Sequence, residues 1–173
     1  RVSRSISLDV RDVILSSMPH LSLDINDSEF SLIKDIDNIE ITFLLLQKKY
    51  QLSLWRLRRL GMFKQAQRLE DYLKEEIFSS KSLAKIAPLG MGFNKTLKTF
   101  FVSSHFGVYK PHISLTESIA RYFSSNYHAE IAAYEFDKIL HLNMVPLTYE
   151  VKYCEHKIGS QQYFVENAYR SRE

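Results

Sequence analysis

Residues 107–111 read GVYKP, residues 128–140 read HAEIAAYEFDKIL and residues 144–148 read MVPLT. These three segments decide the fold, because a short strand that stops at a proline is followed by a polar loop, a helix and another extended run. Lys110 ends the strand, and Glu130 falls in the first turn of the helix. The sequence therefore places one cation and one carboxylate on consecutive elements.

The helix begins after a Ser-Ser-Asn run at 124–126, which offers N-caps, and is expected to continue to about His141. Its apolar positions recur at near-helical spacing and are Ala129, Ala132, Ala133, Phe136, Ile139 and Leu140. The small side chains at 132–133 predict that this stripe packs on a sheet. Close packing would bring Glu130 within reach of Lys110, and a first-turn carboxylate also suits the helix dipole.

Four runs are rich in strand-forming residues. Thr96–Ser103 and His105–Lys110 are separated by a serine pair and predict a hairpin. Leu147–Tyr153 and Ser160–Glu166 flank a turn at Cys154–Gly159. The order strand, strand, helix, strand, strand predicts an α+β fold, with an antiparallel sheet and one covering helix.

The preceding half is predicted to be helical. Between Ser28 and Ala84 there is one glycine, Gly61, and no proline. Apolar spacing predicts one helix from about Phe30 to Leu46 and, over 52–77, either one long helix or a broken pair. Acidic residues gather early and basic residues later, so antiparallel helices would neutralise one another. We therefore expect a mainly helical extension at 1–85 and a small α+β domain at 86–173.

Composition limits the functional classes. The chain has 173 residues, is 45% hydrophobic and carries a net charge of +3, which does not by itself favour a nucleic-acid partner. The single cysteine, Cys154, excludes an internal disulfide. No signal peptide is visible and no apolar run reaches the roughly 20 residues of a membrane span. The first residue is Arg1, so the compartment stays open, with the cytoplasm slightly favoured.

A glycine pair precedes the first predicted strand. Residues 88–96 read PLGMGFNKT, and Gly90 and Gly92 would allow the backbone to approach a phosphate. The segment lacks the Gly-Lys-Ser/Thr of a Walker loop and also the third glycine of Gly-x-Gly-x-x-Gly. A tight turn would explain it equally, and a surface lysine with an ordinary first-turn glutamate would explain Lys110 and Glu130.

Together these segments resemble the small lobe of the secretory-pathway (Golgi casein kinase type) protein kinases. They also resemble bacterial relatives of those kinases, which are in turn similar to phosphatidylinositol 3- and 4-kinase-like proteins. The family has a Phe/Tyr-Lys-Pro strand end, an Ala-Glu-Ile/Val-Ala-Ala helix, a Leu-Asp-Arg-Ile-Leu continuation and a Val-Pro-Pro exit. This chain has Tyr109–Pro111, Ala129–Ala133, Phe136–Leu140 and Val145–Leu147, with Phe, Lys and Leu replacing three of the family residues. The resemblance covers about 88–166.

The resemblance implies a nucleotide site. Lys110 would bind the phosphates of ATP and Glu130 would hold the lysine in place. Gly90 and Gly92 would lie in the loop above the phosphates. The backbone at Phe164, Val165 and Glu166 would meet the adenine. No metal ligand is assigned in this chain, and Mg²⁺ or Mn²⁺ is expected only with a large lobe.

The resemblance stops where the catalytic half of a kinase would start. After Glu166 only seven residues remain, with no His-Arg-Asp and no Asp-Phe-Gly. We therefore expect an ATP-binding small lobe of a kinase-like phosphotransferase that needs a large lobe for catalysis. The alternative is a kinase-derived, non-catalytic module whose N-terminal helices bind a protein partner.

Two other clusters could carry chemistry. Cys154 and His156 have two-residue spacing, but no second pair supports a zinc site, and a turn between strands suffices. The run 55–59, WRLRR, could contact a phosphate backbone or an acidic partner. An amphipathic helix with solvated arginines and a buried Trp55 is the simpler interpretation.

Overall fold

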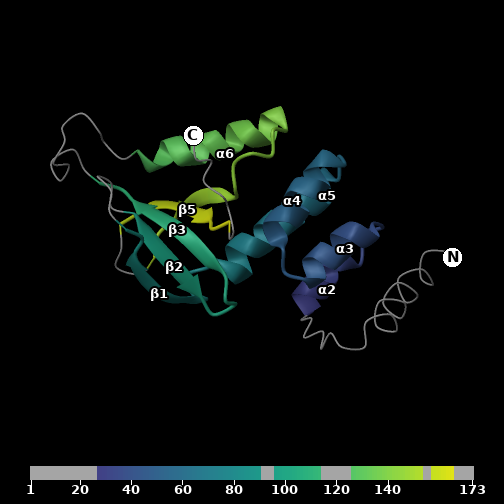
Figure 1. The fold of residues 1–173 in the computed structure, drawn as a ribbon, viewed down its shortest axis with the longest axis horizontal. Coiled ribbons are helices and arrows are strands. Elements are labelled where there is room, and N and C mark those ends of the chain that lie inside the picture. Colours follow the sequence, from purple (N-terminus) through teal and green to yellow (C-terminus); the bar gives the residue numbers. More distant parts are fainter. Residues whose placement is uncertain (1–26, 91–95, 114–125, 154–156, 166–173) are drawn as a thin grey trace, which may run out of the picture.

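The α+β fold predicted from the sequence is confirmed by the structure, a computed structural model that describes residues 27–90, 96–113, 126–153 and 157–165. Helices come first and a five-stranded sheet follows (Figure 1). The sheet has the order β1-β2-β3-β5-β4, and every neighbouring pair is antiparallel. Its strands are β1 (Leu83–Pro88), β2 (Leu97–Phe101), β3 (Phe106–Pro111), β4 (Thr148–Val151) and β5 (Gly159–Tyr163).

Strand β1 corrects the expected four-strand order. It pairs with β2 from Leu83 opposite Phe101 to Pro88 opposite Leu97. This segment contains alanines and a lysine, which have little strand propensity, and its apolar and polar residues do not alternate. The exposure of its side chains does not alternate either. Pairing with β2, a tertiary contact, decides its conformation. The expected domain boundary at residue 85 consequently falls inside a strand.

The helical half contains more breaks than expected. Its elements are α2 (Asp27–Ile33), α3 (Ile39–Leu46), α4 (Tyr50–Arg59), α5 (Phe63–Tyr72) and a π-helical turn, η1 (Leu73–Ile77). The single helix expected up to Leu46 is thus two helices, because Asn38 caps α3 by accepting a 3.1 Å hydrogen bond from the Ile41 amide. The broken pair expected over 52–77 is confirmed, with Gly61 at φ 72° between α4 and α5. None of the described helices is both long and apolar enough to cross a membrane.

Early acids and later bases do pair between helices. Arg56 contacts Glu40 at 2.9 Å, and Arg68 contacts Asp35 at 2.5 Å. All four side chains are about half exposed. Such pairs contribute at most about 1 kcal/mol each, so they match the helix surfaces more than they stabilise the fold.

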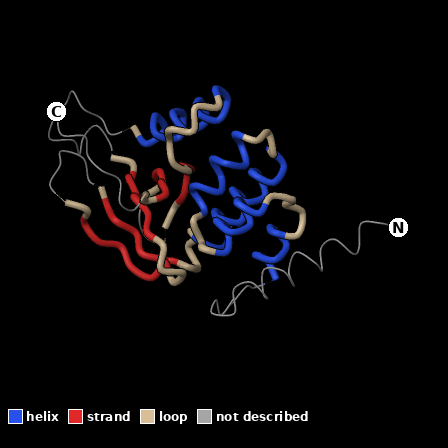
Figure 2. Tube along the Cα trace, turned by 45° about the vertical axis from the view of Figure 1, so that its right-hand side comes forward, coloured by secondary structure: helices blue, strands red, loops and turns tan. Residues whose placement is uncertain are grey.

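The helices and the sheet share one core. Figure 2 shows the helices α2–α5 gathered beside the sheet. Leu54, Leu57 and Leu73 from the helical half are fully buried in the same cluster as Tyr109 and Tyr153 from the sheet half. The Tyr153 hydroxyl also donates a 2.9 Å hydrogen bond to the carbonyl of Phe78. The sheet therefore completes its core with the helices that precede it.

Helix α6 (Tyr127–Leu140) lies across the sheet (Figure 1), but its orientation corrects the sequence-based expectation. The predicted packing stripe faces solvent: the alanines at 129, 132 and 133 are exposed, as are Phe136 (64%), Ile139 (70%) and Leu140 (59%). The buried residues of α6 are Tyr127, Tyr134 and Asp137. Polar partners inside the protein, described below, select this face over the apolar one.

Candidate functional site

Lys110 and Glu130 are in contact. The Nζ atom of Lys110 lies 2.5 Å from Oε1 of Glu130, joining β3 to the first turn of α6. Their side chains are 26% and 37% exposed, so the pair is open to a ligand. A partly exposed ammonium held by a single carboxylate oxygen keeps further donors for phosphate oxygens.

The contact depends on where α6 begins. Asn126 caps the helix by accepting a 3.1 Å hydrogen bond from the His128 amide. Tyr127 then donates from its hydroxyl to Glu150 of β4 at 3.0 Å, which fixes the first turn against the sheet. Glu130 follows within that turn and meets Lys110. The predicted approach of Glu130 to Lys110 is therefore observed. The buried contacts of α6 are made by Tyr127 and Tyr134, however, and not by its alanines.

The glycine loop and the lysine share one end of the sheet. Pro88 of β1 is paired with Leu97, and Leu97 is paired with Tyr109, the neighbour of Lys110. Gly90 lies just beyond Pro88, at φ 146°, and no described atom lies within 4 Å of the position that a Cβ would take. Gly90 and Lys110 therefore lie towards the same end of the sheet, with β2 between their strands. Gly92 lies outside the described residues.

Phe164 and Val165 lie at the other end of β3. The Phe164 amide donates a 3.1 Å hydrogen bond to the Phe106 carbonyl, four residues before Lys110, a distance of roughly 13 Å along an extended strand. Both side chains are half-buried, and the Lys98 ammonium lies 4.6 Å from the centre of the Phe164 ring. Glu166 lies outside the described residues. The predicted base and phosphate contacts are therefore on opposite ends of one strand.

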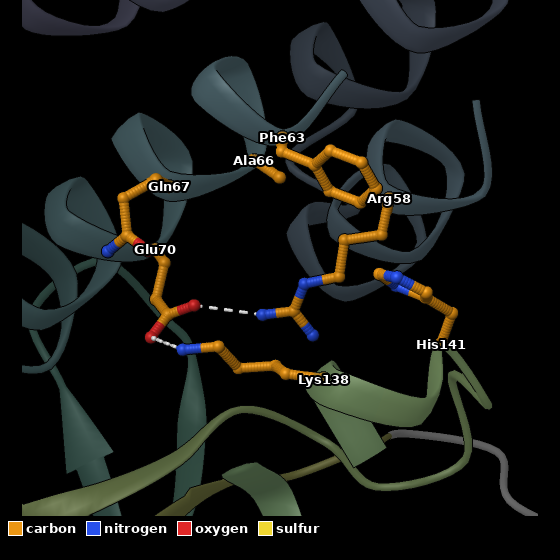
Figure 3. Close-up of a pocket in the computed structure, with 7 residues that line it drawn as sticks. All are labelled: Arg58, Phe63, Ala66, Gln67, Glu70, Lys138 and His141. Carbon is orange, nitrogen blue, oxygen red and sulfur yellow. Dashed lines mark hydrogen bonds and ion pairs between the residues drawn. The ribbon is translucent and has the colours of Figure 1, made fainter. Parts of the chain in front are cut away.

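Sequence reasoning missed a buried ionic network between α4, α5 and α6. Arg58 donates from Nη2 to Oε2 of Glu70 at 2.8 Å (Figure 3). The same atom also donates to the Tyr134 hydroxyl at 2.5 Å. Tyr134 donates in turn to Oε2 of Glu70 at 2.9 Å. The Arg58 and Glu70 side chains are 5% and 1% exposed. The expectation that the arginines of the 55–59 run are solvated is therefore wrong for Arg58. The spacing of this run along a helix gives no sign of a buried acidic partner.

Two lysines also approach the buried carboxylate. Lys74 lies 2.7 Å and Lys138 3.4 Å from Oε1 of Glu70. Burial by itself would raise the pKa of Glu70, but the hydrogen bond and charge of Lys74, the charge of Lys138 and the hydrogen bond from Tyr134 outweigh it and lower that pKa. Burial and the adjacent negative charge of Glu70 raise the pKa of Tyr134. Glu70 is therefore ionised and Tyr134 neutral at pH 7.

Asp137 shapes the Val-Pro exit from α6. Its Oδ1 atom accepts hydrogen bonds from the amides of Met144, at 2.8 Å, and Val145, at 3.2 Å. The helix ends at His141 in the left-handed conformation, with φ 54°. A buried aspartate in the last turns of α6 thus holds the chain where it folds back towards β4.

Metal ligands do not gather in the part of the chain that the structure describes. No three His, Cys, Asp or Glu side chains there lie close enough together to hold an ion. Cys154 and His156 both lie outside the described residues.

Comparison with known proteins adds no relative. No protein-family model matches the chain, and neither a curated protein sequence nor a solved structure does so. Any assignment of function therefore has to stand on the arrangement of the side chains themselves.

Proposed function

We propose that this chain is the ATP-binding small lobe of a kinase-like phosphotransferase. The 2.5 Å contact between Lys110 and Glu130 carries the proposal. Protein kinases place their phosphate-binding lysine on the third strand and its glutamate partner on the helix αC. Here the lysine ends the third strand and the glutamate opens the helix that follows.

Two further positions support a nucleotide. In kinases a glycine-rich loop covers the phosphates, and Gly90 lies in the connection between β1 and β2, beside the Lys110 end of the sheet. Phe164 and Val165 directly follow β5 at the opposite end of β3. An extended ligand along β3 would have its base near residues 164–165 and its phosphates near Lys110.

The residues present fit the phosphate end of ATP. Lys110 would donate to phosphate oxygens, and Glu130 would keep the ammonium in place and charged. ATP supplies the transferable phosphoryl group when bound. The catalytic base and the metal-binding residues of a kinase belong to the large lobe, so this chain alone would bind the nucleotide without transferring the phosphoryl group.

Labelling with an acyl-phosphate derivative of ATP tests the proposal, because the reagent acylates a lysine held beside the phosphates. Mass spectrometry should find Lys110 modified faster than the exposed Lys85, and excess ATP should protect Lys110 alone. Lys110→Arg provides the matched variant, since it keeps the charge but lacks the acylated amine. Equal, ATP-insensitive labelling of Lys110 and Lys85 would reject the proposal.

A second candidate is a kinase-derived module that binds a protein partner through its N-terminal helices. Apolar side chains exposed on those helices favour it, namely Ile39 (83%), Leu60 (54%) and Phe63 (51%). Exposed apolar groups of this size commonly mark interaction sites when they are contiguous. Under this alternative, partner binding would survive Lys110→Ala and nucleotide labelling would be absent.

A further inference from the structure

A small cavity lies between α4, α5 and the end of α6, away from the Lys110–Glu130 pair. Its volume is about 150 Å³, and its walls include Arg58, Phe63, Gln67, Glu70, Lys138 and His141 (Figure 3). Lys138 follows Glu130 by about two helical turns, or about 12 Å along α6. The cavity is therefore a separate feature from the proposed nucleotide site.

The cations at this cavity outnumber its carboxylates. Glu70 is the one acidic side chain in the lining, and Arg58, Lys74 and Lys138 all contact it. Two acids lie next to the lining: Glu135 contacts Lys138 at 3.2 Å and is 49% exposed, and exposed Asp71 accepts from the Gln67 amide at 2.8 Å. Within the described residues, neither Glu135 nor Asp71 has a hydrogen bond or ion pair with Arg58. The lining itself therefore carries two cations, Arg58 and Lys138, against the single carboxylate of Glu70.

Arg58 is incompletely paired. Its Nη2 atom serves both Glu70 and Tyr134, but its Nη1 atom is buried and has no hydrogen-bond partner among the residues that the structure describes. Figure 3 shows the guanidinium between Glu70 on one side and Lys138 and His141 on the other. A buried charged donor without an acceptor is costly, and an acceptor arriving in the cavity would relieve that cost.

We propose that this cavity binds a small oxyanion: inorganic phosphate or the phosphate of a small monoester. Arg58 is the buried cation, and Lys138 and His141 lie where they can close over the anion. Because Nη2 already serves Glu70 and Tyr134, the two hydrogens of Nη1 are the ones that would be donated to phosphate oxygens. A volume of about 150 Å³ holds several waters, each of about 30 Å³ in the liquid, and so admits a tetrahedral oxyanion. It is below the range of roughly 300–1,000 Å³ of pockets for drug-sized ligands, which favours a small anion over a nucleoside triphosphate.

Thermal denaturation of the whole chain tests the proposal at constant ionic strength, with chloride as the reference anion. Inorganic phosphate should raise Tm saturably, by about 5 °C or more at about 100 times its Kd. Glycerol phosphate in a parallel titration separates the two ligand classes: tighter binding identifies a monoester site, and weaker binding a site for the free ion. A Tm that responds to phosphate and chloride alike would overturn the proposal.

Variants locate the anion. Lys138→Ala should weaken phosphate binding about fivefold to tenfold, and Lys138→Arg should restore it, because a cation near phosphate contributes a charge-assisted hydrogen bond. Lys85→Ala, an exposed lysine on β1, should leave the affinity unchanged. Loss of binding in Lys110→Ala but not in Lys138→Ala would place the anion at the other site and refute this one.

Discussion

Arg58 of α4 and Glu70 of α5 form a 2.8 Å ion pair that is almost completely removed from solvent, with side chains 5% and 1% exposed. Tyr134 of α6 hydrogen-bonds to both partners. The pair therefore does more than join two helices of the N-terminal half. It provides the polar partner that turns the Tyr134 face of α6 inward, and so orients the helix that carries Glu130.

Breaking this pair should be strongly destabilising. Glu70→Leu leaves the buried guanidinium of Arg58 without its carboxylate, with an expected loss of about 3–5 kcal/mol in the free energy of unfolding. Arg58→Met should cost less, because Lys74 and Lys138 still contact Glu70. Removing both charges should cost much less than the sum of the two losses. Urea denaturation measures both quantities. Arg56→Met is the matched control, because its pair with Glu40 is about half exposed and contributes at most about 1 kcal/mol. Strictly additive losses would contradict this assignment.

The lowered pKa of Glu70 predicts an acid-dependent stability. Because the folded pKa is below the ordinary value of 4.5, the unfolded state binds the proton more readily. The stabilisation is therefore present above about pH 4.5 and is lost as the pH falls through the folded pKa. The stability difference between the wild-type chain and Glu70→Gln should narrow between pH 6 and pH 3. A difference that stays constant over this range would show that Glu70 does not titrate as proposed.

Gly107 of β3 should not tolerate a side chain. A Cβ at this position would lie 1.7 Å from Nε2 of Gln161, whose fully buried amide crosses the glycine to accept a 3.1 Å hydrogen bond from Thr99. Gly107→Ala should lower the free energy of unfolding by about 1–3 kcal/mol through overpacking. Combining it with Gln161→Ala should give less than the sum of the two losses, because the second change vacates the space. Simple additivity in urea denaturation would argue against this clash.

The apolar stripe of α6 should contribute little to stability. Ile139→Ser alters a side chain that is 70% exposed and should change the free energy of unfolding by about 0.5 kcal/mol or less. Ile41→Ser, at a position 1% exposed in α3, makes the same chemical change in the core and should cost several times more. Comparable losses in the two variants would mean that the stripe is buried after all.

Glu130 should matter for nucleotide binding more than for folding. Its ion pair with Lys110 is partly exposed, so Glu130→Gln should change the free energy of unfolding by at most about 1 kcal/mol. Loss of the positioning carboxylate should nevertheless slow ATP-protected acylation of Lys110 by about tenfold, since the ammonium would sample many more rotamers. Glu135→Gln, on the exposed side of α6, should leave the labelling unchanged. Unchanged labelling in Glu130→Gln would separate Glu130 from the site.

Local patterns predicted most elements but not their faces. The hairpin of β2 and β3, the start of α6 at its Asn126 cap and the later strands follow from strand-forming runs and capping residues. Strand β1 escaped notice because its Ala- and Lys-containing segment gains its hydrogen bonds only from β2. Likewise, the spacing of α6 identified an apolar stripe, but spacing alone cannot tell which side of a helix meets a protein interior.

The sequence by itself determined the α+β order and the succession of Lys110 and Glu130 on a strand and the next helix. These are local properties, set by propensity, capping and proximity along the chain. Only the tertiary structure decided that Arg58 and Glu70 are buried together and that Tyr134, not the alanine stripe, faces inward. The physical reason is that a buried charge requires partners, and Arg58 finds one of them, Tyr134, in a helix that follows only after the first three strands.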